Sequence, residues 1–61
     1  MFNEYKAYDY VKIVAENDWN GLIGTVVQSE QGYLQIFCVQ KAANIYLVNE
    51  NNIGDIEPYA A

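Results

Sequence analysis

The stretch DWNGLIGTVV, Asp18–Val27, sets a tryptophan two residues ahead of two glycines, with a β-branched run after them. Asn20 and Gly21 predict a tight turn, because both residue types tolerate a positive φ. Gly24 lies inside the following run and indicates a β-bulge or a close backbone approach where a sheet bends. Because sheet closure alone accounts for both glycines, we interpret Asn20, Gly21 and Gly24 as structural residues.

Strand patterns dominate the chain on both sides of this stretch. Four segments carry them: Tyr8–Ala15, Leu22–Ser29, Tyr33–Val39 and Ile45–Val48. The run NENN, Asn49–Asn52, predicts one 3₁₀ turn, and a last short strand ends at Pro58, which cannot donate a ladder hydrogen bond. The sequence therefore predicts an all-β fold, a five-stranded antiparallel barrel with a short 3₁₀ turn before the last strand. The alternative is an open meander whose edge a second subunit covers.

Length and composition predict one small domain over residues 1–61, with residues 1–7 as an N-terminal arm. A chain of this size buries only about 60% of the surface that its unfolded form exposes, so the 52% hydrophobic content is needed for a core. The single cysteine, Cys38, has no partner for an internal disulfide. With no apolar run of membrane-spanning length and no secretory signal pattern, we expect a cytoplasmic protein.

Charge disfavours nucleic acid as a partner. The chain has eight acidic residues, three lysines, no arginine and no histidine, for a net charge of −5. Binding to phosphates draws its affinity from lysine and arginine, and arginine is the commonest reader of guanine. We therefore expect a partner other than DNA or RNA.

Taken together, the motifs resemble the SH3-like barrels, in particular the branch with the KOW pattern. DYVKIV, starting at Asp9, is similar to the opening strand of that group, and NGLIGTVV to its Gly-x-x-Gly-x-Val core. VNENNIGDIEP is similar to its 3₁₀ turn and closing strand, with Ile53 and Ile56 at the apolar positions. The glycine that commonly precedes the aspartate of the opening strand is Tyr8 here. The resemblance implies an SH3-like barrel and leaves its function open.

Aromatic residues are the candidates for protein binding. Trp19 either stands exposed as an anchor for a partner or folds back to cap one end of the barrel. The six tyrosines either form a rim that binds a peptide or a second copy, or cover the barrel with their hydroxyls in water. The N-terminal aromatics either pack across the open end or form an exposed arm. The predicted protein-binding residues are Phe2, Tyr5, Tyr8, Trp19 and Tyr46.

Catalysis and metal binding find little support in the residues. Without histidine the usual general base near neutral pH is missing, and Cys38 lies in an apolar strand, where cysteine is typically inert. One cysteine and no histidine exclude the usual zinc sets, and the polar turns lack the spacing of a calcium loop. We predict no enzymatic activity, no metal, no cofactor and no small-molecule substrate.

Three functional hypotheses follow. The first is a protein-interaction module that docks a partner or self-associates through its aromatic and acidic surface. The second is a KOW-type binder of nucleic acid within a ribonucleoprotein. The third is a small regulatory or inhibitory protein that blocks a basic site by its acidity. The acids predicted to converge on one side of the barrel are Glu16, Asp18, Glu50, Asp55 and Glu57.

Overall fold

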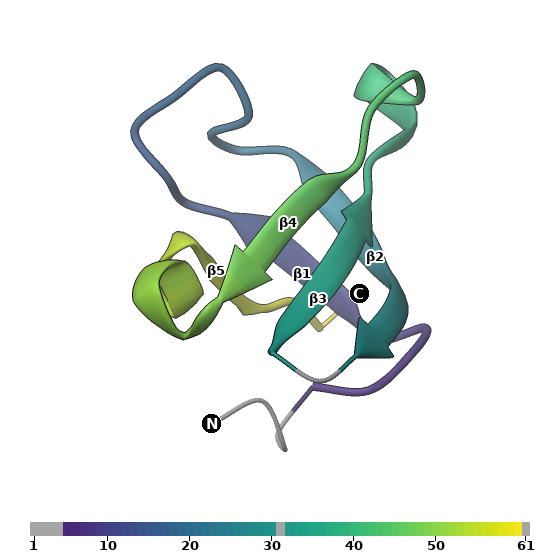
Figure 1. The fold of residues 1–61 in the computed structure, drawn as a ribbon. Coiled ribbons are helices and arrows are strands. Elements are labelled where there is room, and N and C mark those ends of the chain that lie inside the picture. The colour runs from purple at the N-terminus through teal and green to yellow at the C-terminus, as the bar shows by residue number, and fades with distance from the viewer. Residues whose placement is uncertain (1–4, 31, 61) are drawn as a thin grey trace.

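The chain forms one antiparallel sheet of five short strands, curled into a half-barrel (Figure 1). The computed structural model describes residues 5–30 and 32–60. Its strands are β1 (Tyr10–Ile13), β2 (Ile23–Glu30), β3 (Tyr33–Phe37), β4 (Tyr46–Asn49) and β5 (Ile56–Pro58). They pair in the order β4-β3-β2-β1-β5, so the first strand lies between the second and the last. The predicted all-β architecture with five antiparallel strands is confirmed.

Two 3₁₀ helices connect the last three strands. Helix η2 (Val39–Lys41) follows β3, and helix η3 (Glu50–Asp55) precedes β5, where a 3₁₀ turn was predicted from the asparagine-rich run. The side chain of Asn49 accepts a hydrogen bond from the Asn51 backbone N–H, and the Asn52 side chain accepts one from the Asn49 N–H, at 2.8 and 2.6 Å. This reciprocal capping explains why the run ends β4 and begins η3.

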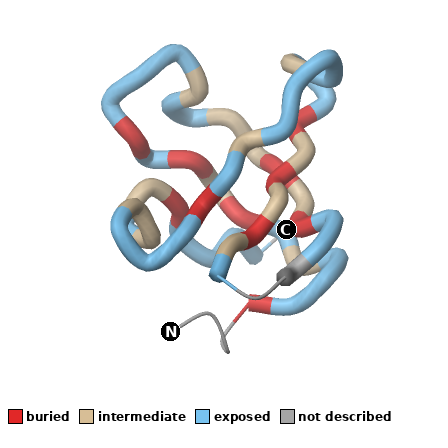
Figure 2. Tube along the Cα trace, in the orientation of Figure 1, coloured by how far each residue is buried: buried red, intermediate tan, exposed pale blue. Residues whose placement is uncertain are grey.

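The core lies on the inner side of the curled sheet (Figure 2). Alternate residues of the strands point inward, as in β1, where Val11 and Ile13 are fully buried while Tyr10 is exposed. The buried apolar residues are Tyr5, Val11, Ile13, Ala15, Val26, Leu34, Ile36, Cys38, Val48 and Ile56. Trp19, Leu22, Tyr46 and Ile53 pack against them while half-buried.

Gly24 of β2 lies close against β3 and its buried side chains. A Cβ atom at Gly24 would stand 2.6 Å from Ile36 Cγ2, 2.8 Å from Cys38 Sγ and 3.1 Å from the Phe37 carbonyl oxygen. Of the two roles predicted for this glycine, the structure shows the close approach. The bulge lies further along β2, between Val26 and Gln28, where the register with β3 shifts.

The predicted first strand begins later than its sequence pattern indicates, because Tyr8 has a φ of +77°. Tyr8 is the third residue of a four-residue turn that the Asp9 N–H closes onto the Lys6 carbonyl at 3.0 Å. A type II turn requires a positive φ at that position and favours glycine there. The backbone is extended only beyond this turn, so β1 starts at Tyr10.

Candidate protein-binding site

The loop from residue 14 to residue 22 positions Trp19 through its own hydrogen bonds. Asn17 accepts the Trp19 backbone N–H on its side-chain oxygen at 2.8 Å, and its carbonyl accepts the Asn20 N–H at 3.1 Å. The Asn20 side chain donates to the Ala15 carbonyl at 2.7 Å. Gly21, with a φ of +89°, is the third residue of the turn that the Leu22 N–H closes onto the Trp19 carbonyl. These hydrogen bonds fix the backbone of the loop on both sides of Trp19.

Trp19 packs against Tyr46 of β4, and the two rings form the centre of the site. Their centroids lie 5.1 Å apart with an interplanar angle of 56°, a tilted arrangement that aromatic pairs favour. Both side chains are half-buried and pack against the core. Trp19 thus packs against the core without being fully buried, and its predicted role in binding a partner stays a prediction. We call Trp19, Tyr46 and the residues whose side chains contact them, Asn17, Lys41 and Asp55, the Trp19–Tyr46 site.

A hydrogen-bond chain fixes the Tyr46 hydroxyl. The side-chain amide of Asn17 donates to it at 3.0 Å, and it donates to Asp55 Oδ2 at 2.9 Å. Asn52 Nδ2 donates to the same carboxylate oxygen at 3.3 Å. Burial is the main cause that raises the pKa of Tyr46, while the bond from Asn17 lowers it and Asp55 raises it further. Loop, strand and η3 are therefore tied together through one phenol.

A positive charge lies over the indole ring. Lys41, the last residue of η2, places its Nζ 5.6 Å from the Trp19 ring centroid, within the range of a cation–π interaction. The Lys41 N–H donates to the Cys38 carbonyl at 2.9 Å, and the Lys41 carbonyl accepts the Asn44 N–H at 3.0 Å. The backbone around Lys41 is thus set by the connection from β3 to β4.

Acidic residues lie on the loop and on the helix that meet at the aromatic pair. Glu16 and Asp18 are exposed on either side of Asn17, which contacts Tyr46. Asp55 reaches the same hydroxyl from η3, and its carbonyl accepts the Val14 N–H at 2.7 Å. By contrast, Glu57 pairs with Lys12 in the β1–β5 ladder, on the outer face. Four of the five acids predicted to converge, Glu16, Asp18, Glu50 and Asp55, thus lie on the loop or on η3, which meet at the Trp19–Tyr46 site, and Asp55 contacts Tyr46 directly.

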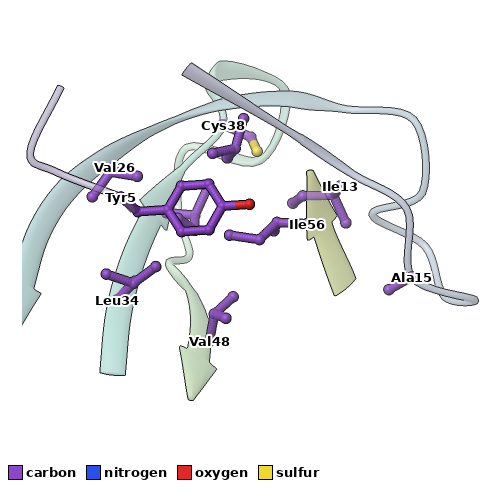
Figure 3. Packing of buried hydrophobic residues seen from close by; sticks show 10 residues of the cluster. Tyr5, Ile13, Ala15, Val26, Leu34, Cys38, Val48 and Ile56 are labelled. Carbon is purple, nitrogen blue, oxygen red and sulfur yellow. The ribbon is translucent and has the colours of Figure 1, made fainter. Parts of the chain in front are cut away.

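The other predicted binding residues lie elsewhere. The Tyr5 ring packs into the core beside Val26, Leu34 and Ile56 and is only 8% exposed (Figure 3). It therefore packs across an end of the core and does not form an exposed arm. Tyr8 is 77% exposed, and its turn, residues 6–9, lies at the opposite side of the ribbon from the loop of residues 14–22 in Figure 1. Phe2 lies outside the described residues.

Sequence reasoning missed Asn17 and Lys41 as parts of this site, and it named Asp55 as one of the converging acids without linking it to Tyr46. Asn17 and Tyr46 are 29 positions apart in the chain, so no local pattern could join them. An asparagine ahead of a tryptophan in a loop is a weak signal for an Asx turn, and Lys41 follows a strand with no periodicity to mark it. Their roles follow only from the curl of the sheet.

Cys38 and the groups that could hold a metal ion are the remaining candidates for chemistry in the described part of the chain. Cys38 is fully buried, and burial raises the pKa of its thiol, which disfavours the nucleophilic thiolate. Across residues 5–30 and 32–60, histidine, cysteine, aspartate and glutamate side chains nowhere gather in groups of three that could hold a metal ion. No helix in this part of the chain has the length and apolarity to cross a membrane.

The sequence matches no protein-family model, and no curated protein or solved structure is significantly similar to it. The geometry of the Trp19–Tyr46 site therefore carries the functional argument.

Proposed function

We propose that this chain is a non-enzymatic protein-interaction module that docks a partner protein at the Trp19–Tyr46 site. The observation that carries the proposal is the partly buried residue pair Trp19 and Tyr46, whose ring centroids lie 5.1 Å apart and whose supporting loop, strand and helix are joined by hydrogen bonds. Tryptophan and tyrosine dominate the binding energy of many interfaces, and a ring that is already ordered loses less freedom on binding. The site thus has both the residue types and the rigidity of an anchor.

The fold is part of the proposal: an SH3-like barrel of the KOW-like branch. Its support is the sequence resemblance, together with the strong curl of five short antiparallel strands and the 3₁₀ helix directly before the last strand. A reducing, cytoplasmic location also belongs to the proposal. Its support is one free cysteine, buried in the core.

The distribution of charge supports a protein partner over nucleic acid. The three lysines are spread over three places: Lys6 in the first turn, Lys12 on the outer side of β1, and Lys41 above the Trp19 ring. Phosphate binding needs several cations on one surface, because affinity grows with each phosphate neutralised. The acids beside Trp19 would repel a phosphate backbone from the same surface.

The test is an affinity pull-down from a lysate of the organism that encodes the protein, with nuclease-treated and untreated halves. Trp19→Ala removes the anchor, Trp19→Phe keeps a smaller ring against Tyr46, and Tyr10→Ala is the control, since Tyr10 is 54% exposed on the outer face. We expect a protein that the wild type and Tyr10→Ala retain in both halves and that both Trp19 variants retain less. Circular dichroism establishes which variants are folded.

Other results would refute the proposal. Retention only in the untreated half would show a nucleic-acid binder. Equal retention by folded Trp19→Phe and wild type would place the interface elsewhere. A partner that all variants hold equally and that salt releases would show an acidic inhibitor, because exposed charges more than a Debye length apart are screened.

A further inference from the structure

The Trp19 ring already holds a cation in the free protein. Lys41 Nζ lies 5.6 Å from its centroid, and the centroid of the Tyr46 ring lies 5.1 Å away. Cation–π contacts at exposed sites are weak, so this one shifts an equilibrium only about two- to fivefold. An external cation that fits the ring better can therefore displace the lysine.

The surroundings of the ring favour a second, stronger cation. The protein carries a net charge of −5, and Glu16 and Asp18 are exposed residues of the loop that carries Trp19. Asp55 adds a third carboxylate on η3, next to Tyr46. Lys41 is the one lysine placed at this site, so the site keeps an excess of negative charge. That excess attracts a basic segment and orients it towards the rings.

Arginine suits this position better than lysine. Its guanidinium is planar, stacks on aromatic faces, and is more weakly hydrated than an ammonium. It can also form two parallel hydrogen bonds with a carboxylate such as that of Glu16 or Asp18. The chain itself has no arginine, so a guanidinium at the ring must come from another molecule.

We infer that the Trp19 ring is the receptor for an arginine in a basic segment of the partner, and that Lys41 occupies this position until the arginine displaces it. The inference rests on the proposed function and specifies its partner. Lys41 acts as a built-in competitor: it lies over the indole face in the free protein and lowers the affinity of every ligand that must displace it.

The experiment compares Lys41→Gln with Lys12→Gln. Both variants change the net charge equally, but Lys12 lies on the outer face of β1, opposite Glu57. The probe is a fluorescein-labelled hexa-arginine peptide, followed by anisotropy at physiological salt. A citrulline peptide of the same length is the neutral control ligand. The binding site is checked through the intrinsic fluorescence of Trp19, the only tryptophan in the chain.

We expect Lys41→Gln to bind the arginine peptide about two- to fivefold more tightly than Lys12→Gln, because the competing contact is gone. We also expect wild type to bind the arginine peptide more tightly than the citrulline peptide, with a change in Trp19 fluorescence. Equal affinities of the two variants would show that only net charge matters and would overturn the displacement. Weaker binding by Lys41→Gln would show that the lysine supports the ring, and would overturn it too.

A further outcome separates this inference from the proposed function. If the arginine peptide leaves Trp19 fluorescence unchanged, while a neutral proline-rich peptide alters it in wild type and not after Tyr46→Ala, the arginine inference fails. The docking function at the Trp19–Tyr46 site then stands with a different ligand. If the pull-down finds no Trp19-dependent protein, the docking function itself fails.

Discussion

Replacing Gly24 with alanine tests the packing of the sheet directly. The new methyl group would meet Ile36 Cγ2 at 2.6 Å and Cys38 Sγ at 2.8 Å, both within a fully buried core, and the Phe37 carbonyl oxygen at 3.1 Å. Overpacking of this kind costs about 1–3 kcal/mol. Alanine also lowers the conformational entropy of the unfolded chain, which stabilises the folded protein by about 0.4–1 kcal/mol. We therefore expect Gly24→Ala to lower the free energy of unfolding by about 1–2 kcal/mol.

That loss is large for a domain of 61 residues, whose total stability is roughly 3–9 kcal/mol. Urea unfolding followed by circular dichroism measures it, and thermal unfolding should show a Tm lowered by about 5–15 °C. Gly54→Ala is the matched control. Apart from its chain neighbours and the backbone of its own helix, no atom lies within 4 Å of a Cβ at Gly54, so the same substitution there should leave stability unchanged or raise it by up to about 1 kcal/mol.

A double mutant identifies the contact responsible. Cys38→Ala removes the sulfur that stands 2.8 Å from the new methyl group, so the methyl can occupy part of the space that the sulfur leaves. The double mutant should therefore lose less stability than the two single mutants added together, with a coupling of at least about 0.5 kcal/mol. Strict additivity, or a Gly24→Ala protein as stable as Gly54→Ala, would refute the packing argument.

Three further predictions concern a turn, a phenol and a thiol. Tyr8→Gly should raise the free energy of unfolding by about 0.5–1 kcal/mol in urea unfolding. A side chain at positive φ costs about 1–2 kcal/mol, and the larger conformational entropy that glycine gives the unfolded chain offsets part of this gain. A destabilised variant would contradict this expectation. Tyr46→Phe should cost about 1 kcal/mol near neutral pH through the lost bonds to Asn17 and Asp55. The pKa of Tyr46 in the folded protein is raised above its ordinary value of 10.0, so the contribution of its protonated hydroxyl to stability is fully present below about pH 10 and is lost as the pH rises through the folded pKa. The stability of the wild type should therefore fall more steeply with alkaline pH than that of Tyr46→Phe. Parallel curves for the two proteins would refute the raised pKa. Cys38, buried and with a raised pKa, should react with a thiol reagent at least about a hundredfold more slowly in the native protein than in denaturant, and fast native labelling would show that the core opens locally.

The strands could be predicted from the sequence because each carries its own local signal. The alternation around Val11 and Ile13 indicates a strand with one buried face, and the capping asparagines mark the start of η3. The residue at which β1 starts could not be predicted in this way. A tyrosine at a φ of +77° contradicts its own local preference, so only its hydrogen bonds to the rest of the fold reveal the turn.

The site was predicted only in part for a related reason. Trp19 and Tyr46 were both candidates, but on different grounds, and nothing in the sequence indicates that their rings touch. Lys41, Asn17 and Asp55 have ordinary polar side chains in turns, and their roles depend on contacts between distant parts of the chain. The role of Tyr5 depended on whether the N-terminal segment folds back onto the core, which composition does not decide.

The position of β1 between β2 and β5 has a consequence for how the molecule assembles. The strands from β1 to β4 can pair one after another through short connections, whereas Ile13 and its partner Ile56 are 43 positions apart in the chain. Closing that long loop costs entropy before any contact repays it, so this ladder should form late and set the folding rate, in milliseconds to seconds. Until then one edge of β1 has its backbone groups free to pair with another chain. Aggregation during refolding should therefore depend on how quickly the helix η3 brings β5 into place.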